Sequence, residues 1–306
     1  MLARWFTGKE LALAFGITLT VSRLGTLFTF NTEALLADRM GFRAALWIAA
    51  GLCVLSLLSN WVYTWMDRHA APVLKLHEAG AGDKITFSDI RKFSASYWYV
   101  ALLCLTFYSA IFPFTALSTD FFHEKWGLPQ AAAVGKGIIE GSLYNITHLF
   151  SSAQGVTSIV IAASMFFAPF AGSLVDRIGR RASLMVLGSL LMIPAHLVMG
   201  LTNLQPILPM IVLGAAFVLV PAAMWPSVPL VVDENRVGTA YGVMTAIQNL
   251  GLLAFPYFNG SLRDATHGYT ASQIMFGGLG FAGLVFAWLL LRADRRAGGA
   301  LERARG

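Results

Sequence analysis

The sequence AGSLVDRIGRRASLMV, residues 171–186, places a short charged turn between two long apolar stretches. Asp176, Arg177, Arg180 and Arg181 surround Gly179, and each flanking stretch has the length of about 20 residues that a helix needs to cross a bilayer. The pattern predicts a tight turn between two membrane-spanning helices. We expect Gly179 to allow the turn, the arginines to pair with Asp176, and Gly172 to let another helix approach closely. The alternative is a plain positively charged anchor at the membrane surface.

The composition of the whole chain supports a membrane protein. Of its 306 residues, 57% are hydrophobic and 12% are charged, whereas about 25% of the residues in a soluble domain are charged. Cys53 and Cys104 lie within apolar stretches and have no metal-binding spacing, so we interpret them as packing residues. There is no phosphate-binding loop, metal-ligand cluster or catalytic motif, so we expect no enzyme activity, cofactor or metal.

The apolar stretches predict an all-α polytopic fold with eight transmembrane helices. They are too long for barrel strands and do not alternate. The predicted spans are residues 10–31, 43–66, 96–118, 153–175, 182–201, 206–232, 238–260 and 271–291.

The basic residues predict the orientation in the membrane. Most of them fall on the side of the membrane that carries both termini. We therefore predict a protein of the cell (inner) membrane with both termini in the cytoplasm. The net charge of +6 is accordingly a topology signal, and we expect lipid rather than nucleic acid as the partner. This set is Arg4, Lys9, Arg68, Lys75, Lys84, Arg91, Lys92, Arg177, Arg180, Arg181, Arg236, Arg292, Arg295, Arg296, Arg303 and Arg305; the opposite side has Arg39, Arg43, Lys125, Lys136 and Arg263.

The longest polar connector divides the chain into parts. We predict a two-helix part over 1–67, a cytoplasmic loop over 68–95, a six-helix part over 96–292 and a basic cytoplasmic tail over 293–306. The weakly apolar segment 119–152 is expected outside, with an interfacial helix. It contains the glycosylation sequon that begins at Asn145.

The turn resembles the signature loop of the major facilitator superfamily, Gly172-x-x-x-Asp176-Arg177-x-Gly179-Arg180-Arg181. Residues 5–25, 107–117, 222–232 and especially 237–252, VGTAYGVMTAIQNLGL, are similar to a branch of that superfamily that contains dipeptide transporters and bacterial relatives; residues 130–152 look like an insertion. The resemblance implies that the eight spans correspond to helices 5–12 of twelve, with helices 1–4 outside this sequence, and that a small-molecule substrate is carried by alternating access.

Several polar residues within the predicted spans are candidates for binding the substrate. Arg23 lies in mid-span, where a charge costs about 2.5–3.5 kcal/mol, so we expect it to bind a substrate carboxylate; a structural ion pair is the alternative. Tyr108 could bond a peptide group near a bend at Pro113, and Trp225 could line the cavity or pack against lipid. Gln248 and Asn249 point about 100° apart on a helix, so we expect at most one to face the cavity.

Two further features complete the candidates. His196 could relay protons, although a hydrogen-bonded packing role explains it as well. Asp233, Glu234, Arg236 and Gly238 lie where spans six and seven meet the cytoplasm, and the resemblance implies an inner gate latch with Asp176. The alternatives for the whole chain are a carrier of another organic anion or a sugar, and a truncated membrane protein that does not transport. The sequence identifies no accessory subunit.

Overall fold

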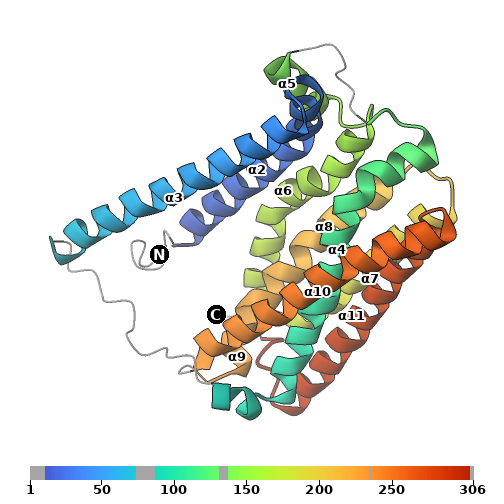
Figure 1. The fold of residues 1–306 in the computed structure, drawn as a ribbon. Coiled ribbons are helices and arrows are strands. Elements are labelled where there is room, and N and C mark those ends of the chain that lie inside the picture. Colours follow the sequence, from blue (N-terminus) through green and yellow to red (C-terminus); the bar gives the residue numbers. More distant parts are fainter. Residues whose placement is uncertain (1–10, 74–86, 131–136, 234–235, 304–306) are drawn as a thin grey trace. The chain divides into compact units, whose positions relative to one another are not determined.

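The chain folds almost entirely into long helices that form two compact units. The computed structural model describes residues 11–73, 87–130, 137–233 and 236–303 (Figure 1). One unit comprises residues 1–81 with 131–148, and the other comprises residues 82–130 with 149–306. We call them unit 1 and unit 2.

Unit 1 is built around a helical hairpin. Helix α2 (Leu11–Met40) and helix α3 (Phe42–Val73) are separated by Gly41 alone. Gly41 has a φ of 82°, a left-handed conformation that favours glycine, and its amide closes α2 on Ala37 O at 2.9 Å. Both helices extend past the ends of the predicted spans 10–31 and 43–66. Polar residues continue each helix beyond its apolar stretch.

The third helix of unit 1 comes from the segment that resembles an insertion. Helix α5 (Ile138–Thr147) packs against α2. Asn145 is fully buried and its Nδ2 donates to Asn31 O at 3.2 Å. Segment 119–152 thus contains a helix, and the Asn145 side chain connects this helix to α2.

Unit 2 contains the remaining long helices. They are α4 (Ala95–Trp126), α6 (Ala153–Ile178), α7 (Arg181–Leu201), α8 (Ile207–Met224), α10 (Val237–Thr266) and α11 (Thr270–Arg296). Short helices η1 (Phe87–Lys92), η2 (Trp225–Ser227) and α9 (Val228–Val231) join them. Helix α4 packs against α6, α10 and α11, and its large aromatic residues, among them Phe107, Phe114 and Phe122, form the core.

Local signals set the ends of α4 and α6. The Tyr97 amide donates to Ser94 Oγ, and the Gly155 amide donates to Ser152 Oγ, so a serine caps the start of each helix. Gly127 ends α4 in a left-handed conformation with a φ of 66°. Helix α4 is therefore longer than the predicted span 96–118 and carries Asp120 and Glu124 in its last turns.

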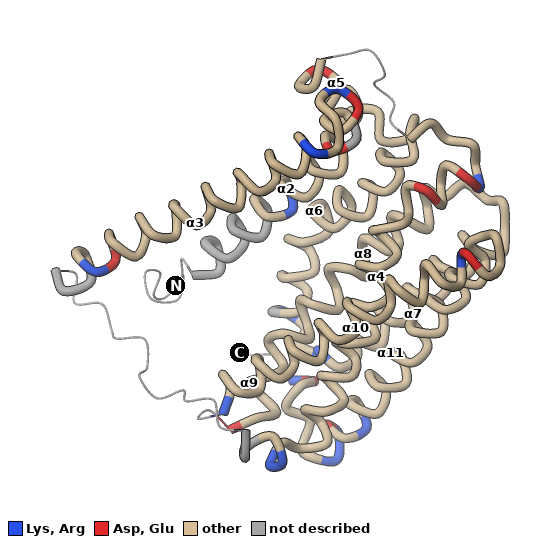
Figure 2. Tube along the Cα trace, viewed as in Figure 1, with Lys and Arg blue, Asp and Glu red and all other residues tan. Residues whose placement is uncertain are grey.

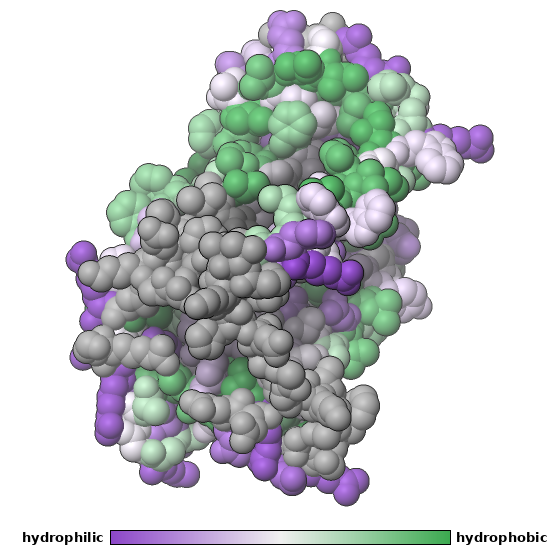
Figure 3. All heavy atoms as spheres, turned by 90° about the vertical axis from the view of Figure 1, so that its left-hand side faces the viewer, coloured by the Kyte–Doolittle hydropathy of each residue, from purple (hydrophilic) through white to green (hydrophobic). Residues whose placement is uncertain are grey.

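Six of the described helical stretches are long and apolar enough to cross a membrane: Phe42–Ala70, Ala95–Trp126, Ala153–Val175, Arg181–Leu201, Ile207–Val231 and Thr270–Arg296. The other two predicted spans fall in α2 and α10, which are each 30 residues long. Many large apolar side chains of α3 are exposed, among them Trp47, Trp61 and Trp65. Figure 3 shows apolar residues in broad patches on one face, as a protein in lipid requires.

Candidate functional site

The candidate site of unit 2 begins at a break in a helix. Pro229 has no amide hydrogen, so it cannot donate the helical bond to the Trp225 carbonyl four residues earlier. That carbonyl instead accepts from the Val228 amide, in a 3-10 turn, and from the hydroxyl of Tyr241 on α10 at 2.9 Å. The stretch after α8 that contains Pro226 and Pro229 is thus a defined interruption, and the Tyr241 side chain of α10 satisfies its free carbonyl.

Trp225 joins three elements at this break. Its indole Nε1 donates to the hydroxyl of Tyr108, near the middle of α4, at 3.0 Å. Its ring stacks with Tyr241 at a centroid distance of 5.9 Å, and Tyr108 stacks with Phe112 at 5.6 Å. We call Tyr108, Phe112, Trp225 and Tyr241 the aromatic cluster. Trp225 and Tyr241 are partly exposed within unit 2, so the cluster is part of its surface.

Gln248 and Asn249 take different directions from α10, as their spacing predicted. Gln248 Oε1 accepts from Cys104 Sγ on α4 at 3.6 Å, so this residue faces the same helix as Tyr108. Asn249 is exposed, and its Nδ2 bonds Thr245 O within α10. Farther along, Asn259 Nδ2 donates to Pro113 O at 3.3 Å, beside the proline in α4.

The signature turn has the geometry that its glycine suggested. Gly179 has a φ of 70° and Arg180 a φ of 39°, so two left-handed residues separate α6 from α7. Arg177 and Arg180 are exposed, whereas Arg181 is only 4% exposed. Arg181 is therefore a packing residue as much as a surface charge.

Two further expectations about the signature turn concern Asp176 and Gly172. The side chain of Asp176 lies outside the described residues, and so does its expected pairing with the arginines. No described atom lies within 4 Å of a Cβ built on Gly172, so close approach of a helix at this glycine is not part of the packing of unit 2.

The remaining candidates are not members of the aromatic cluster. Arg23 lies on α2 in unit 1 and is partly buried. Gly238 is in the first turn of α10. Arg236 Nη1 pairs with Asp233 Oδ2 at 2.8 Å within the preceding loop, and Glu234 lies outside the described residues.

His196 lies in the core of unit 2. It is fully buried, and its Nδ1 lies 2.9 Å from Gln273 Oε1 on α11. The rings of Phe114 and Phe276 flank it at 5.0 and 5.4 Å. This is the hydrogen-bonded packing role that we weighed against proton relay.

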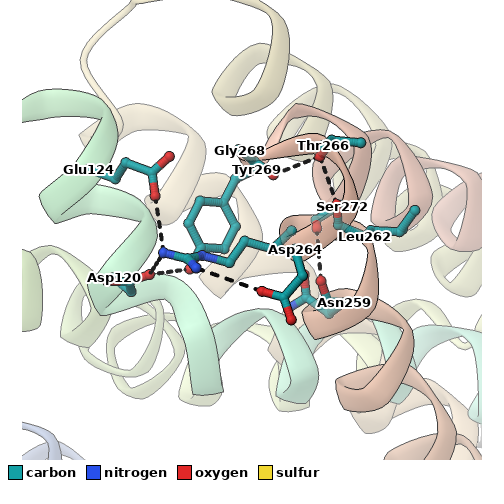
Figure 4. Close-up of polar contacts among 10 residues, drawn as sticks. Asp120, Glu124, Asn259, Leu262, Asp264, Thr266, Gly268, Tyr269 and Ser272 are labelled. Carbon is teal, nitrogen blue, oxygen red and sulfur yellow. Dashed lines mark hydrogen bonds and ion pairs between the residues drawn. The ribbon is translucent and has the colours of Figure 1, made fainter.

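Sequence reasoning missed Tyr241 and an ionic network at the end of α4. Arg263 of α10 pairs with Asp120 and Glu124, which Figure 4 labels; its Nη2 lies 3.2 Å from Asp120 Oδ2 and 3.5 Å from Glu124 Oε2. The hydroxyl of Tyr269 donates to Asp120. Burial, and then the bond to Asp120, raise the pKa of Tyr269, so its hydroxyl remains a donor to a higher pH than that of an ordinary tyrosine. The four-residue spacing of Asp120 and Glu124 was the available signal.

The site is chemically a neutral surface with hydrogen-bonding groups. Figure 2 shows charged residues mostly near the ends of the helices, with long uncharged middles. Within the described ranges no group of three or more His, Cys, Asp or Glu residues could hold a metal. Hydroxyl, indole and amide groups within such a surface suit the binding and release of a polar solute rather than covalent chemistry.

Long apolar helices, an interrupted helix and a charged turn between two spans define a polytopic membrane protein. The chain belongs to the Major Facilitator Superfamily, whose family model matches residues 1–153 and 137–306. Among curated proteins it is similar to the lysosomal dipeptide transporter MFSD1 of Danio rerio, with 33% identity over 89% of this chain and 57% of the relative. The MFSD1 proteins of Homo sapiens and Mus musculus are both 31% identical over 97% of this chain and 62% of the relative. The chain thus spans about three fifths of the length of these relatives.

Proposed function

We propose that this chain works in a carrier that moves a dipeptide across a membrane by alternating access. Membership of the superfamily supports the carrier class, and the relatives named as dipeptide transporters support the substrate. The proposal includes a multi-pass protein in the cell membrane with both termini in the cytoplasm, as the distribution of basic residues predicts.

The observation that carries the proposal is the aromatic cluster at the break after α8. Interrupted membrane helices place polar groups at substrate sites of secondary transporters. Here Tyr108 and Tyr241 hold Trp225 in the interruption. We propose that Tyr108, Trp225 and one of the two residues Gln248 and Asn249 contact the peptide. We also propose that Arg23 of unit 1 binds a substrate carboxylate in a bidentate pair.

The signature turn supplies the moving part of the proposed mechanism. We assign Gly172, Asp176, Arg177, Gly179, Arg180, Arg181 and Gly238 to an inner gate. The left-handed conformation of Arg180 between α6 and α7 supports this assignment, since residues in sparsely populated backbone conformations cluster at switch regions.

The test is counterflow of radiolabelled dialanine in vesicles that contain the purified protein, with glucose and succinate as competitors. We expect dialanine flux, and we expect Trp225→Phe to lower it at least several-fold because the indole donor to Tyr108 is lost. Trp288→Phe is the matched control, since Trp288 is 47% exposed on α11. Flux of succinate or glucose alone, or binding of dialanine without flux, would contradict the proposal.

A further inference from the structure

The chain reverses direction after α11 and returns to the signature turn. Gly298 and Gly299 have φ values of 100° and 74°, which favour glycine. Asp294 organises the reversal: its carbonyl accepts from the Gly299 amide at 2.8 Å, and its Oδ1 accepts from the Leu301 amide at 3.0 Å. Leu301 is fully buried. We call residues 297–302 the C-terminal strap.

Helix α7 begins without a cap of its own. The first amides of a helix have no partner within it, and a Ser, Thr, Asp or Asn side chain usually supplies one. At α7 the capping position is Arg180, whose side chain makes no such bond. These amides would therefore need an acceptor from elsewhere in the protein.

The C-terminal strap supplies the missing acceptors. Leu301 O accepts from the Arg181 amide at 2.8 Å. The carboxylate of Glu302 accepts from the Ser183 amide at 2.9 Å and from the Ser183 hydroxyl at 2.7 Å. A carboxylate also complements the positive end of the helix dipole. The cap of α7 thus comes from the segment that follows α11.

We propose that the C-terminal strap is a positioning element of the signature turn, with Glu302 as its main contact. Arg180 precedes the capped amides directly and has a left-handed conformation that a residue with a Cβ rarely adopts. Fixing Arg181 and Ser183 fixes the end point of that turn. The consequence for transport rests on the proposed function: movement of the turn requires the strap to move with it or to release it.

Hydrogen exchange of the full-length protein in detergent tests the structural part. Replacing a capping side chain with Ala weakens the start of a helix, so we expect Glu302→Ala to speed exchange at the amides of Arg181 and Ser183 about tenfold. Glu302→Asp should restore part of the protection. Asp264→Asn removes a carboxylate that is 79% exposed on α10 and should change nothing there. Unchanged exchange in Glu302→Ala would overturn the proposal.

Dialanine counterflow tests the consequence for the gate. A residue that positions the turn without touching substrate should change the maximal rate and leave KM as in the wild type. We expect Glu302→Ala to change the maximal rate several-fold, and Ser183→Ala to change it in the same direction. An unchanged rate, or a change in KM alone, would overturn the gating role. If the unsubstituted protein carries no dialanine, the proposed function fails, and the exchange experiment still decides whether the strap positions the turn.

Discussion

At the scale of single residues, the site depends on pairs that meet only in the folded chain. Pro229 leaves the Trp225 carbonyl without its helical donor, and Tyr241 supplies one from α10. The sequence identified Tyr108 and Trp225 as candidates because aromatic residues with polar groups within a span are conspicuous. It could not identify Tyr241, because its role depends on how α10 packs beside the end of α8.

Tyr241→Phe should lower stability while keeping the ring that stacks on Trp225. We expect a loss of about 1 kcal/mol, the usual contribution of one hydrogen bond, because the Trp225 carbonyl loses the hydroxyl donor. The measurement is the midpoint of thermal unfolding in detergent. Tyr257→Phe on the same helix, at a residue 72% exposed, is the control and should leave the midpoint unchanged. Equal midpoints for Tyr241→Phe and the wild type would refute this assignment.

Two glycines of α10 should respond to alanine in opposite directions. A Cβ on Gly251 would clash with the Ser109 and Leu105 side chains, so Gly251→Ala overpacks the contact with α4 and should cost about 1–3 kcal/mol. A Cβ on Gly242 meets nothing within 4 Å, so Gly242→Ala should stabilise the helix by about 0.5–1 kcal/mol. Unfolding midpoints measured side by side check both signs, and a stabilising Gly251→Ala would contradict the described packing.

At the scale of elements, the sequence predicted the helices better than their ends. The apolar stretches identified where each helix lies because a bilayer requires a minimum length. The ends escaped prediction because polar residues there find partners on other helices: Asp120 and Glu124 extend α4 beside Arg263 of α10. The cap of α7 escaped prediction for the same reason.

The packing of helix α5 leads to a prediction about glycosylation at Asn145. The side chain is fully buried and donates to Asn31 O, so a glycosylating enzyme cannot reach its amide in the folded protein. Expression in a glycosylating eukaryotic host should therefore give protein whose gel mobility is unchanged by glycosidase treatment. A glycosidase-sensitive shift that disappears in Asn145→Gln would show that α5 separates from α2 during or after synthesis, so that Asn145 becomes accessible.

At the scale of the whole molecule, charged residues lie mostly near the ends of the helices (Figure 2). The network of Asp120, Glu124, Arg263 and Tyr269 is half-exposed at its ionic contacts, so its ion pairs contribute little by themselves. Tyr269 is the buried member. Its hydroxyl connects the start of α11 with the end of α4.

Tyr269 in this network should make the folded protein less stable at alkaline pH. The pKa of Tyr269 is raised in the folded state, so its contribution is complete below the ordinary tyrosine pKa of about 10 and is lost as the pH rises through the folded value. Unfolding midpoints of the wild type should therefore fall more steeply above about pH 10 than those of Tyr269→Phe. Parallel curves for the two proteins would contradict a structural role for this hydroxyl.

The C-terminal strap also has a consequence for how the chain is made. Ser183 and Glu302 are 119 residues apart, and ribosomes add about 5–20 residues per second, so roughly 6–24 s separate the two. During that interval α7 is already synthesised while its first amides have only water or lipid headgroups as acceptors. The signature turn therefore reaches its final form only once Glu302 has been synthesised, later than the helices on both sides of the turn.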